Sequence, residues 1–219
     1  MAKPWSASAR ARSGIGAREP AAERADGLEV RAVPDRVERG LVYLHRSELR
    51  SLDATPRVLG SFAERHGIPV VETVSGKASL LASHPLYGGP LGVTGSESAN
   101  NLAGRADVVL AVGTRLGDFT TGSWTVFSNP NTRIIGLNAA AFDAGKHRSQ
   151  ALVGDAAATL PELSALLDGV HTSAEWREEQ TRNVAGYHAY IDGIAAPEAV
   201  GPNALPTYAQ VVGVADRSA

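Results

Sequence analysis

The chain has 219 residues, of which 43% are hydrophobic and 20% are charged. This length and composition fit one globular domain with extensions and allow a sizeable buried core. The net charge of −2 excludes a general attraction to nucleic acid or to anionic membranes. The absence of cysteine excludes disulfides, thiolate nucleophiles and Cys-ligated metals. No apolar run reaches the roughly 18 residues of a membrane span, so we expect a cytoplasmic protein with no nucleic-acid or membrane partner.

Residues 1–40 show no sustained hydrophobic period of two or 3.6 residues, and Gly, Pro and Arg are scattered through them. Two short apolar runs, Leu28–Val33 and Leu41–Leu44, are candidate strands without strong boundaries. The basic start, rich in Ala, Arg and Ser, is also found in transit peptides, but we favour a disordered or misassigned leader. The first predicted region is therefore an irregular leader over residues 1–50.

A regular pattern begins near residue 52. An apolar stripe at helical spacing follows Pro56, and Gly67 is expected to end that helix. The run Ile68–Val71 predicts a strand, with Pro69 at its start or at a sheet edge. Gly76-Lys77 follows, but the spacing is not that of a phosphate-binding loop, so we interpret it as an ordinary loop.

A glycine-rich loop comes next, with Gly88, Gly89, Gly92 and Gly95. These glycines let the chain pass close to a ligand or to another backbone segment. Thr94 or Ser96 can cap the helix that follows, and the N-terminus of that helix is an available anion site. A tight loop before a capped helix explains the same residues equally well.

Two apolar runs predict strands: Asp107–Val112, which is as apolar as a parallel strand buried on both faces, and Arg133–Leu137. Gly113-Thr114-Arg115 follows the first run, at the carboxyl end where α/β sheets bind ligands. Arg115 is a candidate anion contact, or it pairs with Asp118 or another local acid. Asn138 stands at the end of the second run, where an acid commonly holds a ribose hydroxyl; the amide weakens a nucleotide assignment. The pattern predicts an α/β fold with a doubly wound, Rossmann-like parallel sheet.

The C-terminal third continues this pattern and then changes. We expect a surface loop at Asp118–Trp124, a short strand at Ala151–Val153 and a helix capped by Asp155. A polar helix is expected from Ala174 to about Tyr190, with Trp176 and Tyr187 as its apolar anchors. A linker over 191–205 and a new amphipathic helix from Leu205 follow. The predicted domains are thus residues 51–170 and a helical segment, 171–219, that opens a further domain.

The run from about Phe62 to Asp155 resembles the central domain of thiamine-diphosphate enzymes of the acetolactate synthase and pyruvate oxidase group. The residues that carry the resemblance include G-V-T-G-S-E-S-A-N at 92–100, A-D-V-V-L-A-V-G-T-R at 106–115 and F-T-T-G-S-W at 119–124. Within the group, F-T-T-G-S-W, L-N-A-A-A-F-D-A-G-K-H at 137–147 and L-P-T-Y-A-Q-V at 205–211 look most similar to the trihydroxycyclohexane-1,2-dione hydrolases of inositol catabolism.

The resemblance implies a parent enzyme that opens a cyclic diketone with thiamine diphosphate and a divalent metal, usually Mg²⁺. In that family an N-terminal domain supplies an activating glutamate, and a C-terminal domain supplies a G-D-G motif that holds metal and diphosphate. This sequence has no G-D-G, and the strand at 40–44 is not followed by the family's glycine cluster. We therefore expect a fragment without independent thiamine chemistry and predict no catalytic and no metal-binding residue in it. Its expected partners are the missing thiamine-binding domains or further copies in a homo-oligomer.

Some related central domains bind FAD or ADP along the same loops. Carried over, the resemblance implies cofactor-binding positions at Gly92, Thr94, Gly95, Gly113, Thr114, Arg115 and Asn138. Two hypotheses follow: the scaffold domain of a thiamine-dependent carbon–carbon hydrolase, and a stand-alone ADP- or FAD-binding or regulatory module. We favour the structural role, since a fold alone does not define a function.

Overall fold

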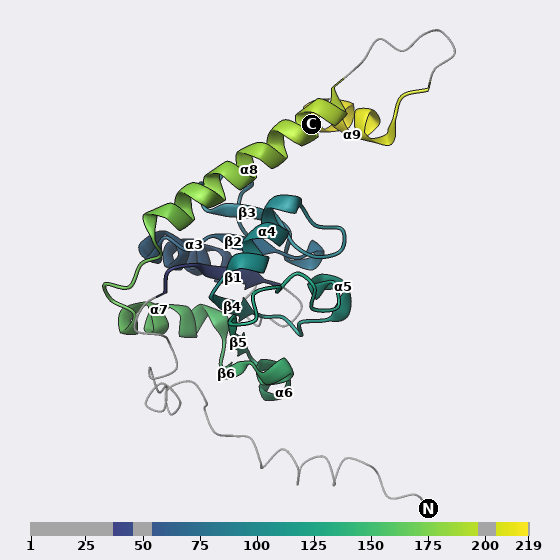
Figure 1. Cartoon of the computed structure of the whole chain (residues 1–219). Coiled ribbons are helices and arrows are strands. Elements are labelled where there is room, and N and C mark those ends of the chain that lie inside the picture. The colour runs from purple at the N-terminus through teal and green to yellow at the C-terminus, as the bar shows by residue number, and fades with distance from the viewer. Residues whose placement is uncertain (1–36, 46–53, 197–204, 219) are drawn as a thin grey trace, which may run out of the picture.

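The computed structural model describes residues 37–45, 54–196 and 205–218. Figure 1 shows a layered α/β body from which one long helix, α8, extends away, with α9 beside its far end. The body is one sheet of six parallel strands in the order β3-β2-β1-β4-β5-β6. The strands are β1 (Gly40–Leu44), β2 (Val70–Glu72), β3 (Tyr87–Pro90), β4 (Val108–Val112), β5 (Arg133–Asn138) and β6 (Gln150–Val153). The predicted doubly wound fold is confirmed.

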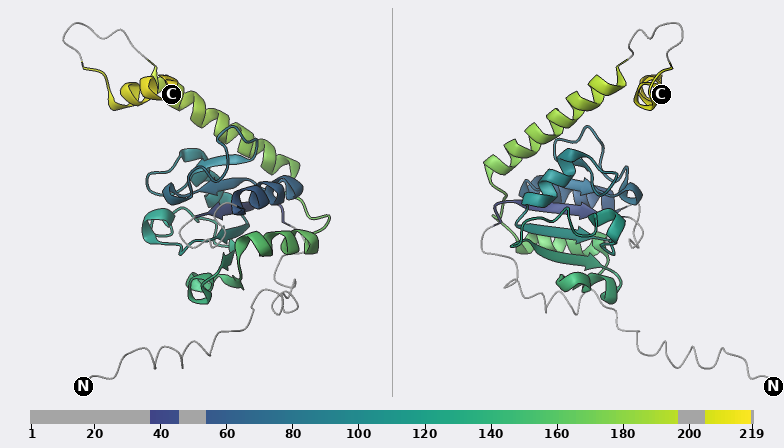
Figure 2. Two further views of the ribbon diagram at one scale, coloured as in Figure 1. Left: turned by 180° about the vertical axis from the view of Figure 1, so that it is seen from behind. Right: turned by 45° about the vertical axis from the view of Figure 1, so that its right-hand side comes forward.

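Helices cover both faces of the sheet, which is why the central strands read as continuous apolar runs. On one face lie α3 (Thr55–His66) and α7 (Ala156–Leu166), over a core that includes Val42 and Leu110. On the other lie α4 (Glu97–Arg105) and the start of α8 (Ala174–Ala195), over Leu41 and Val109. Figure 2 shows the helices on the two sides of the sheet. Shorter elements are η2 (Val74–Gly76), α5 (Asp118–Thr121), α6 (Ala141–Ala144) and η3 (Lys146–Arg148), and α9 spans Tyr208–Ser218.

Strand β1 lies in the middle of the sheet, parallel to both β2 and β4. The strand expected at Leu41–Leu44 is confirmed, so the interval 1–50, predicted to be an irregular leader, contains a central strand. The sequence pattern alone gives little weight to this strand, because no turn signal lies directly beside its five residues. In addition, the strands with which it pairs are distant in the chain. The candidate strand Leu28–Val33 falls outside the described residues.

The predicted helix boundaries follow local chemistry. Gly67 ends α3 in the left-handed conformation with φ 62°, and the Asp155 carboxylate accepts the backbone N–H groups of Ala157 and Ala158 to cap α7. Ser96, rather than Thr94, caps α4: its hydroxyl accepts from the Ala99 N–H at 3.1 Å.

Two expected irregular segments contain helix. The loop Asp118–Trp124 begins with the single turn α5, and α8 continues to Ala195, past the start of the linker predicted at 191. Trp176 is the anchor of α8: its ring is buried and its Nε1–H donates to the Gly40 carbonyl at 2.8 Å. Tyr187 is partly exposed.

Candidate functional site

The candidate site lies at the carboxyl edge of the sheet, where the strand order reverses between β1 and β4. In open α/β sheets, ligands bind in the crevice outside this switch point. At the described part of this edge, His45 follows β1; its N–H donates to the Val112 carbonyl at 3.0 Å, and its Nδ1 lies 2.7 Å from the Thr73 hydroxyl. The ends of β1, β2 and β4 are thereby joined.

The Gly113-Thr114-Arg115 turn follows β4 and is held by the chain itself. Gly113 has φ 60° and its N–H donates to the Leu137 carbonyl at 2.9 Å, while the Thr114 hydroxyl accepts from the Leu116 N–H at 3.0 Å. Leu116 is buried although its φ of 50° is left-handed, a conformation that the surroundings must enforce. The turn is therefore rigid, and it leaves the Arg115 side chain exposed at the edge.

Asn138 is buried and uses both ends of its amide within the chain. Its Nδ2 donates to the Thr114 carbonyl at 3.2 Å, and its Oδ1 accepts from the Ala140 N–H at 2.9 Å. An ionised acid could accept but could not donate at this place. The amide thus connects the ends of β4 and β5, which explains why asparagine stands here.

The loop from Gly92 to Gly95 packs against backbone. A Cβ on Gly92, which has φ 114°, would lie 3.0 Å from the Thr120 carbonyl oxygen, and a Cβ on Gly95 would lie 2.6 Å from that of Pro90. The Asn100 side chain bonds the N–H and the carbonyl of Gly92. These glycines are required by close backbone approach, and Thr94 between them is exposed.

The structure therefore groups the predicted positions in two sets. Gly113, Thr114 and Asn138 are in direct contact, and the Gly92–Gly95 loop meets the segment after β4 through the Val93 N–H, which donates to the Phe119 carbonyl at 3.2 Å. Ligand contact by any of these positions stays a prediction.

Tyr43 was missed by sequence reasoning and lies beneath these loops. It is fully buried near the end of β1, and within the part of the chain that the structure describes its hydroxyl has no hydrogen-bond partner. Burial raises its pKa, and the nearby Thr120 and Thr114 side chains partly offset this. The available signal was a single polar atom in an otherwise apolar strand.

Glu72, at the end of β2, is a second buried polar group that sequence reasoning passed over. Its Oε1 accepts from the Tyr87 hydroxyl at 2.9 Å, while its Oε2 has no partner among the described residues. Burial raises the pKa of this carboxyl, and the hydrogen bond from Tyr87 offsets part of the rise. Burial and the adjacent Glu72 also raise the pKa of Tyr87. Burial thus favours the protonated form of this carboxyl, whereas the hydrogen bond from Tyr87 favours the ionised form.

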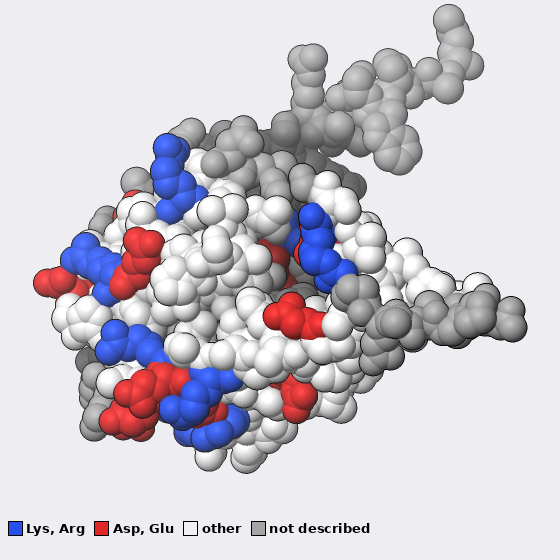
Figure 3. Space-filling model, turned by 90° about the horizontal axis from the view of Figure 1, so that it is seen from above, with Lys and Arg blue, Asp and Glu red and all other residues white. Residues whose placement is uncertain are grey.

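Among the described residues, no group of three or more His, Asp or Glu side chains could hold a metal ion. Within the same ranges, no helix is long and apolar enough to cross a membrane. Seen from above, Lys and Arg are interspersed with Asp and Glu rather than forming a field of one sign (Figure 3). The visible face therefore offers no basic patch of the kind that attracts nucleic acid.

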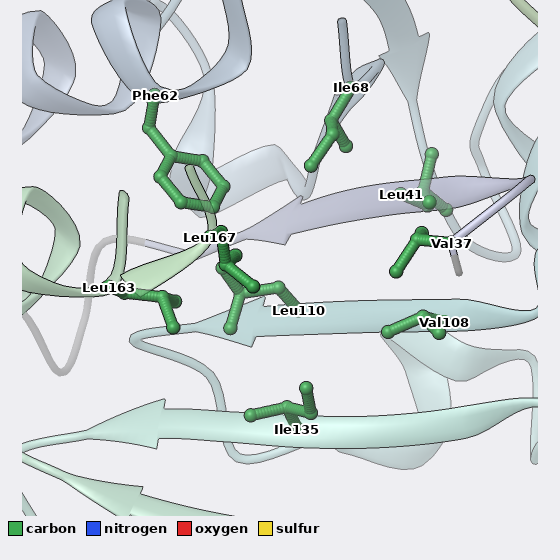
Figure 4. A pocket seen from close by; sticks show the side chains of 10 residues that line it. Val37, Leu41, Phe62, Ile68, Val108, Leu110, Ile135, Leu163 and Leu167 are labelled. Atoms are coloured by element: carbon green, nitrogen blue, oxygen red, sulfur yellow. The ribbon is translucent and has the colours of Figure 1, made fainter. Parts of the chain in front are cut away.

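Two hollows lie away from the carboxyl edge. One of about 40 Å³ is entirely apolar and sits at the amino end of the strands, lined by Val37, Gly40, Val108 and their neighbours (Figure 4). It is too small for a cofactor. The other, about 410 Å³, is a groove between α3 and α7 with Arg57 and Arg65 on its rim. Arg65 is paired with Asp168 at 2.7 Å.

The family described as the central domain of thiamine pyrophosphate enzymes matches residues 50–163, more than half of the chain. The chain belongs to this family, and the resemblance inferred from the sequence is confirmed.

Among curated proteins, the chain is 39% identical over 135 residues to the 3D-(3,5/4)-trihydroxycyclohexane-1,2-dione hydrolase of Clostridium perfringens (strain 13 / Type A), covering 57% of this chain and 21% of the relative. It is 42% identical over 117 residues to the protein of the same name in Geobacillus thermodenitrificans, covering 53% and 18%. The chain thus spans about a fifth of the length of these relatives.

Proposed function

We propose that this chain is the central scaffold domain of a thiamine-diphosphate-dependent carbon–carbon hydrolase of the trihydroxycyclohexane-1,2-dione hydrolase type, inactive by itself. The observation that carries the proposal is the identity of about 39% to these hydrolases, together with the family match over residues 50–163 of the sheet body. The carboxyl edge supports the scaffold role, because the Asn138 side chain and the Gly92–Gly95 loop make their contacts within the chain. On this proposal the domain positions other domains and supplies no reacting group.

The described residues do not fit thiamine diphosphate with its magnesium ion. Mg²⁺ that carries a diphosphate is usually held by one or two carboxylates besides the phosphates. In the family these come from the G-D-G motif, and that motif is absent from this sequence. We therefore assign the cofactor to other domains of the complete enzyme.

The alternative function is an ADP- or FAD-binding module. The observation that favours it is the exposed guanidinium of Arg115 beside the switch point, since this group can bind a phosphate in a two-pronged contact. The burial of Asn138 speaks against it, because the side chain is 2% exposed and its amide is turned to the Thr114 carbonyl and the Ala140 N–H inside the chain.

The test is thermal unfolding of the purified chain, alone and with ADP, FAD, or thiamine diphosphate with Mg²⁺. A ligand at about 100 times its dissociation constant adds roughly 2.7 kcal/mol to the free energy of unfolding. We expect one cooperative transition that none of the three shifts. A shift with ADP or FAD that Arg115→Ala abolishes would establish the nucleotide module instead.

An activity assay completes the test. Once cooperative unfolding has shown that the chain is folded, hydrolysis of the trihydroxycyclohexanedione is measured with thiamine diphosphate and Mg²⁺. We expect no turnover above the protein-free reaction. Turnover that requires thiamine diphosphate would contradict the scaffold proposal.

A further inference from the structure

Residues 117–127, which include α5, form a compact loop after β4 (Figure 1), here called the strap. Within the part of the chain that the structure describes, a single backbone-to-backbone hydrogen bond joins the strap to another segment, from the Val93 N–H to the Phe119 carbonyl. The other backbone bonds of the strap run inside it, for example from the Ser123 N–H to the Asp118 carbonyl at 2.8 Å. Loops of this length that pack on themselves are frequently functional.

The chain is fixed on both sides of the strap. Before it, the Leu116 N–H donates to the Thr114 hydroxyl at 3.0 Å. After it, the Asn129 Nδ2 donates to the Ala106 carbonyl at 2.9 Å. The strap itself begins at Gly117, where nothing lies within 4 Å of an added Cβ. The backbone at the two ends of the strap can therefore turn while the sheet stays in place.

The backbone of the strap is strained. Gly122, Ser123 and Trp124 have φ values of 55°, 49° and 72° in succession, a stretch of left-handed helix that side chains disfavour. The Trp124 ring is held by the ring of His147, which follows β5 and is also left-handed, with φ 55°. The centroids of these two rings are 4.3 Å apart. Strain of this kind persists only where surrounding contacts enforce it, and it is concentrated at functional sites.

The strap covers Tyr43 on β1. The Phe127 ring lies edge-on to the Tyr43 ring, with centroids 6.3 Å apart, and Thr120 lies near the Tyr43 hydroxyl. That hydroxyl is buried and has no hydrogen-bond partner among the described residues, which disfavours the closed arrangement. Burial of Val126 and Phe127 against the core stabilises it. These opposing effects make the closed strap the stable form and leave an open form within reach.

We propose that the strap is a lid over the switch point of the sheet and that the contact between Trp124 and His147 is its latch. Lifting the strap would uncover the Tyr43 hydroxyl and the Thr114 side chain at the place where open α/β sheets bind ligands. It would also release the left-handed residues. The lid goes beyond the scaffold role, because it controls access to polar groups that the closed domain keeps from solvent.

Amide hydrogen exchange of the full chain, followed by NMR, tests the lid. The Ser123 and Val126 amides are hydrogen-bonded within the strap, and the Leu110 amide reports on β4. Because local opening requires less free energy than global unfolding, we expect the two strap amides to exchange at least about tenfold faster than Leu110.

Two substitutions should shift this exchange in opposite directions. His147→Ala removes the latch and should speed exchange of the Val126 amide about three- to tenfold, the value of one aromatic pair. Ser123→Gly relieves left-handed strain and should slow the same amide about three- to tenfold. His188→Ala is the matched control, because this histidine is also exposed and beside an aromatic ring, but on α8; it should change neither rate.

Thiol labelling gives a second measurement, since the chain has no cysteine of its own. Thr114→Cys places a thiol at a buried position beneath the strap, and Ser164→Cys places one at a buried position on α7, across the sheet. Adding His147→Ala should speed maleimide labelling of Thr114→Cys about three- to tenfold and leave that of Ser164→Cys unchanged.

Three outcomes would each overturn the lid: strap amides that exchange only as fast as Leu110, a strap exchange rate that His147→Ala leaves unchanged, or equal acceleration of both thiols. The last would show that the substitution loosens the whole domain. None of these outcomes bears on the ligand and turnover tests of the scaffold function.

Discussion

The sheet body (residues 37–45 and 54–170) and the α8–α9 hairpin (residues 186–195 and 205–218) use the same residue types in opposite ways. In the body, valines and leucines fill two cores on either side of the sheet. In the hairpin, Val211, Val212 and Val214 face solvent. The body completes its own core and is expected to fold by itself, whereas the hairpin has apolar surface that only another polypeptide surface can cover.

The glycines show the same contrast. A Cβ on Gly76 would lie 2.5 Å from the Leu44 carbonyl oxygen, and one on Gly136 would lie 2.3 Å from that of Ala144. Backbone packing thus requires glycine at these body positions. A Cβ on Gly186 or Gly193 of α8 meets nothing within 4 Å. Stability in the body therefore depends on close packing, while α8 beyond the body is limited mainly by helix propensity.

The largest effect is expected where the two regions join. Trp176→Ala removes a buried ring and its hydrogen bond to the Gly40 carbonyl, and should lower the free energy of unfolding by about 3–5 kcal/mol. Tyr190→Ala, on the exposed part of the same helix, should change it by no more than about 0.5 kcal/mol. Urea denaturation measures both. Equal losses would show that the two regions are packed alike.

The next effect tests whether the carboxyl-edge glycines serve packing. Gly95→Ala places a Cβ 2.6 Å from backbone atoms and should lower the free energy of unfolding by about 1–3 kcal/mol. Gly117→Ala is the matched control, because its φ is −68° and nothing lies within 4 Å of the added Cβ. The control should be neutral or slightly stabilising. If Gly95→Ala were harmless, the close approach described for this loop would be wrong.

A pH-dependent effect is expected from Glu72. Its pKa is raised in the folded state, so both states hold the proton below about pH 4.5, the ordinary value. As the pH rises above that value, the unfolded state ionises first, and the free energy of unfolding falls until the folded pKa is passed. The total fall is about 1.4 kcal/mol for every pH unit that separates the folded pKa from the unfolded pKa.

Glu72→Gln removes this titration while its amide oxygen can still accept from Tyr87. Its stability relative to wild type should increase as the pH rises above about 4.5, measured by denaturation at each pH. Tyr87→Phe removes the donor that favours ionised Glu72, so its loss of stability with rising pH should be larger than that of wild type and extend to higher pH. If the difference in free energy of unfolding between Glu72→Gln and wild type did not change with pH, Glu72 would not be the group that titrates.

The smallest effect is expected in α8. Gly186→Ala should stabilise the chain by about 0.5–1 kcal/mol, because alanine is the better helix former and the position has open space. Thermal unfolding followed by circular dichroism measures this gain. A loss would mean that another surface approaches Gly186 closely, and would place this side of α8 in an interface.

The sequence predicted local features well and distant relations poorly. Gly67 and Asp155 act on atoms a few residues away, so their spacing is enough to locate helix ends, whereas the start of α4 is predicted only as Thr94 or Ser96. The importance of β1 was not visible, because its partners, β2 and β4, are about 28 and 68 residues further along the chain. The sequence pattern indicates a weakened ligand contact at Asn138, whereas the hydrogen bond that explains this amide joins it to the Thr114 carbonyl, 24 residues away in the chain.

By itself, the sequence determined the class of this protein. Apolar runs of strand length, glycine turns at their carboxyl ends and helix caps define a doubly wound sheet, since periodicity and capping act within a few residues. Only the tertiary structure decided which polar groups the fold buries, as at Tyr43 and Glu72, and which apolar face it leaves uncovered, as on α9. Burial depends on which distant segments pack together, and no local pattern contains that information.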